Sequence, residues 1–174
     1  MCDFEVIFVA GVHGVGKSYF CSKMAETFKL PNFSASSLIK EEKNAKVDFN
    51  KNVLDLEKNQ DCFIHAVNKI KTSARKIIID GHFCLLENNK ITKVPVHTFE
   101  KISLKSIIVL YDSAPNIYDR LQQRDKNSFS INIISQMQEQ EIKQAEYVAT
   151  YLNIPYEKVH FSVVEQCCRI WDIF

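Results

Sequence analysis

Short apolar runs recur along the chain and are separated by longer segments in which apolar residues have helical spacing. The runs at residues 5–10 (EVIFVA), 76–80 (KIIID) and 105–111 (KSIIVLY) are rich in β-branched and aromatic side chains. Continuous runs of this kind are typical of strands that are buried on both faces. The sequence therefore predicts three central strands, with two shorter strands at the beginning of 32–43 and of 156–174.

The segments between these runs have the apolar spacing of amphipathic helices. A glycine-rich loop at 11–16 follows the first strand and precedes a helix that ends before Pro31. The apolar stripe of this helix consists of Phe20, Met24, Ala25 and Phe28. Further helices are predicted within 50–74, within 112–124 and over about 131–152.

Several segments carry more local signals. Ser36 or Ser37 is expected to cap the short helix of 32–43, because a serine hydroxyl accepts a hydrogen bond from a free amide of the first turn. Polar residues near 59–61 suggest a bend between two helices. Residues 82–99 predict a hairpin or a loop excursion with Asn88-Asn89 at its turn, and the chain is expected to finish with a closing helix.

Strands that alternate with helices predict βαβ units with right-handed crossovers. We therefore expect an α/β fold in which a doubly wound parallel sheet forms the middle of three layers. The chain has 174 residues, the size of one domain, and no repeat, low-complexity tract or long linker divides it. Residues 1–174 are accordingly predicted to form a single domain.

Composition narrows the class of protein. The formal net charge is +1, so no overall field favours nucleic acid or an anionic membrane. No apolar run approaches the about 18 residues that a membrane helix needs, and the N-terminus has no signal-peptide pattern. The six cysteines lack metal-ligand spacing, which indicates free thiols and a cytoplasmic protein. They are Cys2, Cys21, Cys62, Cys84, Cys167 and Cys168.

Residues 11–18 (GVHGVGKS) match the phosphate-loop pattern G-x-x-x-x-G-K-[ST] in full. In such a loop the glycines let backbone amides surround phosphate oxygens at the start of a helix. Lys17 would reach the β- and γ-phosphates of ATP, and the Ser18 hydroxyl would bind Mg²⁺. The predicted nucleotide-binding residues are Gly11, His13, Gly14, Val15, Gly16, Lys17, Ser18 and Tyr19.

A second candidate is the carboxylate that ends the strand at 76–80. In open α/β sheets the ligand crevice lies at the carboxyl ends of the strands, which would place Asp80 beside Gly11. Asp80 is therefore predicted to lie in the ligand crevice, although a strand-end carboxylate could simply cap the following turn. His82, two residues on, could contact substrate or be a polar turn residue, and both interpretations stay open.

Four segments give the chain a resemblance to the P-loop nucleotide kinases, adenylate-kinase-like and AAA-type small kinases. These are FVAGVHGVGKS, FSASSLIKEE, KIIIDGHF and SAPNIYDRLQQRD. The resemblance implies that Arg120 and Arg124 clamp the transferring phosphoryl group and that Asp80 holds a magnesium-bound water. It also implies that residues 36–74 form the acceptor side, with Ser34, Ser37 and Lys40 as candidate contacts.

The chain departs from the family pattern at informative positions. His13 stands in place of the usual proline, Ser37 in place of an aspartate and Lys40 in place of an arginine. Residues 125–130 (DKNSFS) would form a much reduced lid. The linker 125–130 and the helix at 36–46 are expected to be the mobile parts that exclude water during transfer.

The chemical class of the phosphate acceptor depends on whether the site offers a general base to remove a proton from it. A hydroxyl acceptor needs a general base, and FSASS offers only serines at the position where sugar and nucleoside kinases often carry a carboxylate. A monophosphate is already ionised, so we expect a (deoxy)nucleoside monophosphate kinase that uses ATP and Mg²⁺. Asp80 could instead serve as base for a hydroxyl acceptor on a nucleoside, metabolite or polynucleotide end, the last disfavoured by the near-neutral charge.

A different class of function stays open as well. Only four arginines are present, and the C-terminal CCRIWDIF is unusually apolar for a chain end. These features would fit an ATP-binding switch or sensor subunit that acts through a protein partner. The base, the sugar and the oligomeric state are not readable from the residues.

Overall fold

The computed structural model describes residues 4–45, 56–87, 90–124 and 129–164. The strands are β1 (Glu5–Ala10), β2 (Asn32–Ser34), β3 (Lys76–Asp80), β4 (Cys84–Glu87), β5 (Lys90–Lys93), β6 (Leu104–Tyr111) and β7 (Tyr156–His160). The helices are α1 (Lys17–Phe28), α2 (Ala35–Ala45), α3 (Leu56–Asn68), α4 (Val96–Glu100), α5 (Ala114–Arg124) and α6 (Ile131–Leu152).

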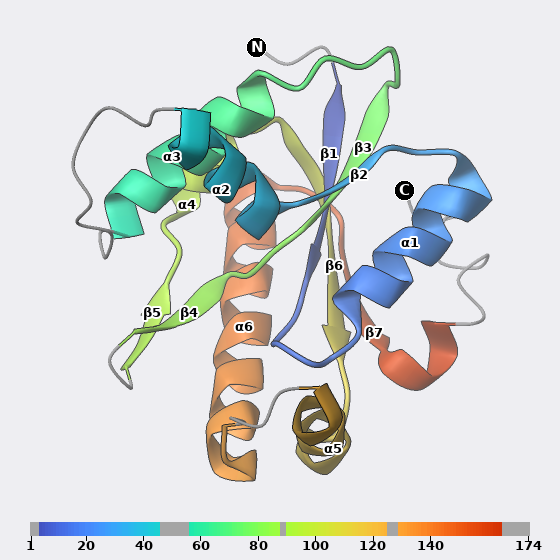
Figure 1. Cartoon of the computed structure of the whole chain (residues 1–174), viewed down its shortest axis with the longest axis vertical. Coiled ribbons are helices and arrows are strands. Elements are labelled where there is room, and N and C mark those ends of the chain that lie inside the picture. Colours follow the sequence, from blue (N-terminus) through green and yellow to red (C-terminus); the bar gives the residue numbers. More distant parts are fainter. Residues whose placement is uncertain (1–3, 46–55, 88–89, 125–128, 165–174) are drawn as a thin grey trace.

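Within the described residues, five strands form one parallel sheet in the order β2-β3-β1-β6-β7. The central strand β1 pairs with β3 on one side and with β6 on the other (Figure 1). Because all five strands run the same way, the loops that follow β1, β3 and β6 leave the same edge of the sheet. This edge carries the phosphate loop and Asp80.

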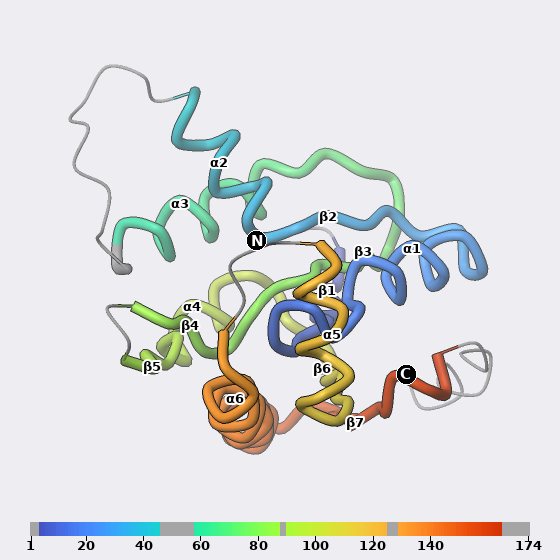
Figure 2. The backbone as a smooth tube through the Cα atoms, turned by 60° about the horizontal axis from the view of Figure 1, so that its bottom comes forward, coloured from blue at the N-terminus to red at the C-terminus, as the bar shows by residue number. Residues whose placement is uncertain are grey.

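Alternate residues of β1 enter two separate cores, because successive side chains of a strand point to opposite faces. Val6 and Phe8 pack with α3, α4 and most of α6, whereas Ile7 and Val9 pack with α1 and α5. Figures 1 and 2 show α6 and α1 on opposite sides of the strands. The predicted α/β fold, with a doubly wound parallel sheet between two helical layers, is confirmed.

Several local predictions are confirmed. The hairpin predicted within 82–99 is the antiparallel pair β4–β5, and the long helix covers Ile131–Leu152. The first apolar stripe also packs inward: Phe20 and Met24 are buried, and Ala25 and Phe28 pack against the same core. None of the described helices is long and apolar enough to cross a membrane.

Two local predictions are wrong. Helix α2 begins at Ala35, directly after β2, so Ser36 and Ser37 lie in its first turn and not before it. Helix α3 is continuous from Leu56 to Asn68 without a break near 59–61, and its residues Phe63, Ala66 and Val67 pack into one core. The apolar C-terminal residues 165–174 and most of the lid linker, 125–128, lie outside the described residues.

Candidate active site

The phosphate loop joins β1 to α1 at the edge of the sheet. Gly16 precedes the first residue of α1 with a φ of 107°, a conformation that side chains with a Cβ rarely adopt. A Cβ at Gly16 would also meet the ring of Phe161 at 2.1 Å, so this loop lies tightly against the chain that follows β7. The sequence therefore places glycine where both the backbone turn and the packing require it.

Lys17 is buried at the start of α1, and its ammonium group turns back into the loop. Its Nζ donates to the carbonyl oxygens of Gly11 at 2.7 Å and Val12 at 3.1 Å. Burial lowers the pKa of Lys17 to about 8, and the nearby carboxylates of Glu141 and Asp80 limit this decrease. The lysine that would neutralise phosphates is thus a desolvated cation in a site with negative neighbours.

Asp80 ends β3 beside Ser34, its partner in β2. Burial raises the pKa of Asp80, while Lys17 and a hydrogen bond from Ser34 act in the opposite direction. Both residues line a cavity of about 530 Å³ that also contains Lys17 and Ser18. The carboxylate, the ammonium group and the hydroxyl predicted to act on phosphates therefore share one cavity.

His82 lines the same cavity two residues after Asp80. Its ring lies 4.4 Å from that of His13, measured between ring centroids. Burial lowers the pKa of His82 well below its usual range, and the charge of Lys17 adds to this effect. His82 is therefore a neutral imidazole near pH 7.

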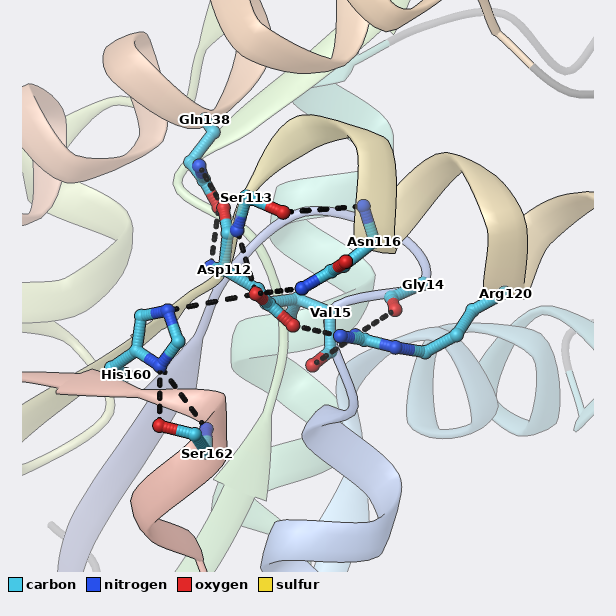
Figure 3. Close-up of polar contacts among 9 residues, drawn as sticks. All are labelled: Gly14, Val15, Asp112, Ser113, Asn116, Arg120, Gln138, His160 and Ser162. Carbon is cyan, nitrogen blue, oxygen red and sulfur yellow. Dashed lines mark hydrogen bonds and ion pairs between the residues drawn. The ribbon is translucent and has the colours of Figure 1, made fainter.

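Arg120 approaches the phosphate loop from α5 (Figure 3). It donates to the carbonyl oxygens of Gly14 at 2.9 Å and Val15 at 3.1 Å, and it pairs with the buried carboxylate of Asp112. Its guanidinium also stacks on Phe161, 4.4 Å from the ring centroid. These contacts make Arg120 a support of the loop in this structure, and its predicted role as a clamp on phosphate remains a prediction.

Asp112 follows β6 and is itself held from several directions (Figure 3). Its Oδ1 accepts hydrogen bonds from the amide of Ser113 at 2.7 Å and the Asn116 side chain at 2.9 Å. Gln138 of α6 bonds both the amide and the carbonyl of Asp112, and His160 lies 3.5 Å from its Oδ1. The network connects α5, α6 and β7 to the end of β6.

The structure brings most of the predicted site residues together. Those that line the cavity are His13, Gly14, Gly16, Lys17, Ser18, Tyr19, Ser34, Asp80, His82, Arg120 and Arg124. Gly11 and Val15 are buried parts of the loop itself. Ser37 and Lys40 are exposed on α2 and are not among the lining residues, whereas Ser36 is.

Three polar residues of this region escaped the sequence analysis. Glu141 is 1% exposed and lies on the buried side of α6, so a carboxylate within an apolar helical stripe was the available signal. Gln60 of α3 is buried and lines the cavity. Asp112 directly follows a buried strand, as Asp80 does, and that position could have marked it.

Solved structures of other proteins share this fold. A solved gluconokinase from Sinorhizobium meliloti 1021 is similar in fold at a TM-score of 0.51 and 12% identity, covering 91% of this chain and 83% of that one. A candidate kinase from Chloroflexus aurantiacus J-10-fl has a TM-score of 0.54 and 13% identity, with coverages of 99% and 98%. An uncharacterised protein from Eubacterium ventriosum ATCC 27560 has a TM-score of 0.52 and 10% identity, covering 98% of this chain and 99% of that one.

No curated protein sequence matches the chain. A sequence-family profile described as "AAA domain" matches residues 10–143, which is more than half of the chain and includes the phosphate loop, Asp80 and both arginines of α5. The chain therefore belongs to this AAA-domain family of P-loop kinase-like proteins.

Proposed function

We propose that the protein is an ATP-dependent phosphotransferase that phosphorylates a (deoxy)nucleoside monophosphate. The observation that supports this acceptor is the composition of the cavity beyond Asp80. Its wall there is apolar and partly aromatic, and it consists of Phe8, Ile39, Phe63, Leu85, Val94 and Phe99. Such a surface suits a planar heteroaromatic base and offers little to a polyhydroxylated sugar acid, whose hydroxyls would lose their hydrogen bonds to water.

Gln60 adds a polar group to this apolar wall. The residue is 6% exposed, and its side chain makes no hydrogen bond to another residue of the described ranges. A carboxamide carries both a donor and an acceptor, the combination that pairs with the edge of a nucleobase. Gln60 lines the cavity, so its amide is open to a ligand with a complementary edge.

The other end of the cavity fits ATP. The loop amides, Lys17 and the N-terminus of α1 would bind the phosphates. Ser18 and Asp80 offer the oxygen ligands that Mg²⁺ prefers, and Mg²⁺ bound there would neutralise charge on the β- and γ-phosphates.

The transfer itself needs little from the protein beyond position and charge. An oxygen of the acceptor phosphate would attack the γ-phosphorus, the bond to the β–γ bridging oxygen would break, and ADP would leave. No proton has to be removed from an ionised acceptor phosphate. Lys17 and Arg124, which both line the cavity, would stabilise the charge that develops during transfer.

A hydroxyl acceptor is the second candidate, and one observation favours it. Asp80 lines the cavity and burial raises its pKa, which makes its carboxylate a stronger base for a hydroxyl proton. The likeness in fold to a gluconokinase agrees with this alternative.

The test is transfer of labelled γ-phosphate from Mg-ATP to a panel of acceptors. The panel contains the common ribo- and deoxyribonucleoside monophosphates, free nucleosides, gluconate and a 5′-hydroxyl oligonucleotide. We expect transfer to one or a few monophosphates, abolished by Lys17→Ala. Gln60→Leu should raise KM for the accepted monophosphate by about tenfold, because one base hydrogen bond is lost, with little change in KM for ATP.

Other results would contradict the proposal. Transfer to a hydroxyl alone would establish the second candidate, and His82→Ala and Asp80→Asn would then identify its base. Tight ATP binding without transfer to any acceptor would contradict both candidates and would favour an ATP sensor that acts through a partner.

A further inference from the structure

A buried carboxylate lies behind the loops that line the cavity. Glu141 is near the middle of α6, 1% exposed, on the same buried side of the helix as Met137, Ala145 and Val148. Burying a carboxylate is strongly unfavourable unless hydrogen bonds replace its hydration. The hydrogen bonds that Glu141 accepts therefore indicate what this residue does.

Both carboxylate oxygens of Glu141 accept hydrogen bonds from backbone amides. Oε1 accepts from Gly11 at 3.2 Å and from Phe83 at 2.9 Å, and Oε2 accepts from Cys84 at 2.7 Å. Gly11 opens the phosphate loop, whereas Phe83 and Cys84 belong to the chain that follows β3. One side chain thus joins two segments that pairing between strands does not connect at this point.

The first of these segments holds Lys17 through the carbonyl of Gly11, and the second follows Asp80 and contains His82. The carbonyl of Gly11 accepts the hydrogen bond from Lys17, while its amide donates to Glu141, so the peptide groups of this residue are fixed from two directions. The segment after β3 follows Asp80 directly and includes His82, whose Nδ1 lies 3.9 Å from Oε1 of Glu141. A displacement of either segment would alter the separation between Lys17 and Asp80.

We infer that Glu141 is a positioning residue whose carboxylate fastens the start of the phosphate loop to the backbone after β3 and thereby sets Lys17 relative to Asp80. Its effect on turnover rests on the proposed function. Its effect on the loops and on nucleotide binding does not depend on the acceptor.

The substitution Glu141→Gln tests the hydrogen bonds with little change in shape. A carboxamide has one accepting oxygen, and its NH₂ group would face at least one amide that also donates. The variant therefore loses at least one of the three bonds and places two donors together. Val148→Ala is the matched control. Val148 is fully buried on the same helix, and its substitution removes only apolar contacts.

The experiment compares the two variants with the wild-type protein by hydrogen exchange, by Mg-ADP calorimetry and by transfer kinetics, at a temperature where all are folded. In Glu141→Gln we expect faster exchange of the amides of Gly11, Phe83 and Cys84 by about tenfold or more. Mg-ADP should bind about tenfold more weakly, and kcat should fall with it. Val148→Ala should leave these three amides and the Mg-ADP affinity within about threefold of wild type.

Equal changes in both variants would overturn the inference, because a general loss of packing would then explain them. If Glu141→Gln does not fold, Glu141→Asp gives the same comparison, since it keeps the charge but is shorter by one methylene. Absence of transfer by the wild-type protein would contradict the proposed function alone. Exchange and Mg-ADP binding would still decide the role of Glu141.

Discussion

Two side chains hold the phosphate loop at different points along its length. Glu141 binds the amide of Gly11 at the beginning of the loop, and Arg120 binds the carbonyls of Gly14 and Val15 near its end. A loop fixed before binding loses less conformational entropy when phosphates arrive and has its dipoles already oriented.

The pair of Arg120 and Asp112 should be strongly coupled in stability. Arg120→Ala removes the cation beside a carboxylate that is 4% exposed, and the free energy of unfolding should fall by about 2–3 kcal/mol. Asp112→Ala should cost a similar amount, because Arg120 then loses its partner. Urea unfolding of both single variants and the double variant should give a coupling energy of about 1–3 kcal/mol. Additive losses would contradict a direct energetic link between the two residues.

At the scale of elements, α2 is docked on α3 by a buried carboxylate. Glu42 of α2 lies 2.6 Å from Nδ1 of His65 and 3.1 Å from Nζ of Lys69, at the end of α3. Its side chain is 4% exposed, whereas both partners are about half exposed. Because α2 carries Ser36 and Ile39 into the cavity wall, this contact positions that part of the wall, which is the acceptor side under the proposed function.

Removing that contact should affect the acceptor more than ATP. Glu42→Ala should lower the free energy of unfolding by about 1–3 kcal/mol and raise KM for the acceptor several-fold, with KM for ATP nearly unchanged. Steady-state kinetics with each substrate varied in turn, and urea unfolding, measure these effects. Glu41→Ala, an exposed neighbour on the same helix, is the control. Equal increases in both KM values would show that α2 does not act on the acceptor end alone.

Sequence reasoning located the elements whose signals are local. The phosphate loop and the strand that ends at Asp80 are each recognisable from a run of consecutive residues. The parallel sheet follows from the order of strands and helices along the chain. Glu141 could not be assigned in this way, since its bond to Gly11 joins positions 130 residues apart. Gln60 and Lys40 show the same limit: which side of a helix faces a cavity depends on how that helix docks, which no local pattern specifies.

At the scale of the whole molecule, the site places two buried charges where they affect global stability. The folded state lowers the pKa of Lys17 from 10.5 to about 8, so above pH 8 the unfolded chain binds more protons at this group. Stability contributed by Lys17 therefore rises between about pH 8 and 10.5. Burial raises the pKa of Glu141 from 4.5 to about 7. Between these pH values the folded state binds more protons at Glu141 than the unfolded chain does. The stability that Glu141 contributes therefore falls as pH rises from 4.5 to 7.

Nucleotide binding should change in the opposite direction to stability above pH 8. Once Lys17 loses its proton, the fold is relieved of a buried charge, but the phosphates lose the cation that neutralises them. We expect the free energy of unfolding of wild type, relative to Lys17→Met, to rise from pH 8 to 10 in urea titrations. Over the same range the affinity for Mg-ATP should decline in the wild-type protein and stay low and nearly constant in the variant. If the stability difference and the affinity both stay constant from pH 8 to 10, Lys17 instead stays charged in the fold, with Glu141 and Asp80 offsetting its burial.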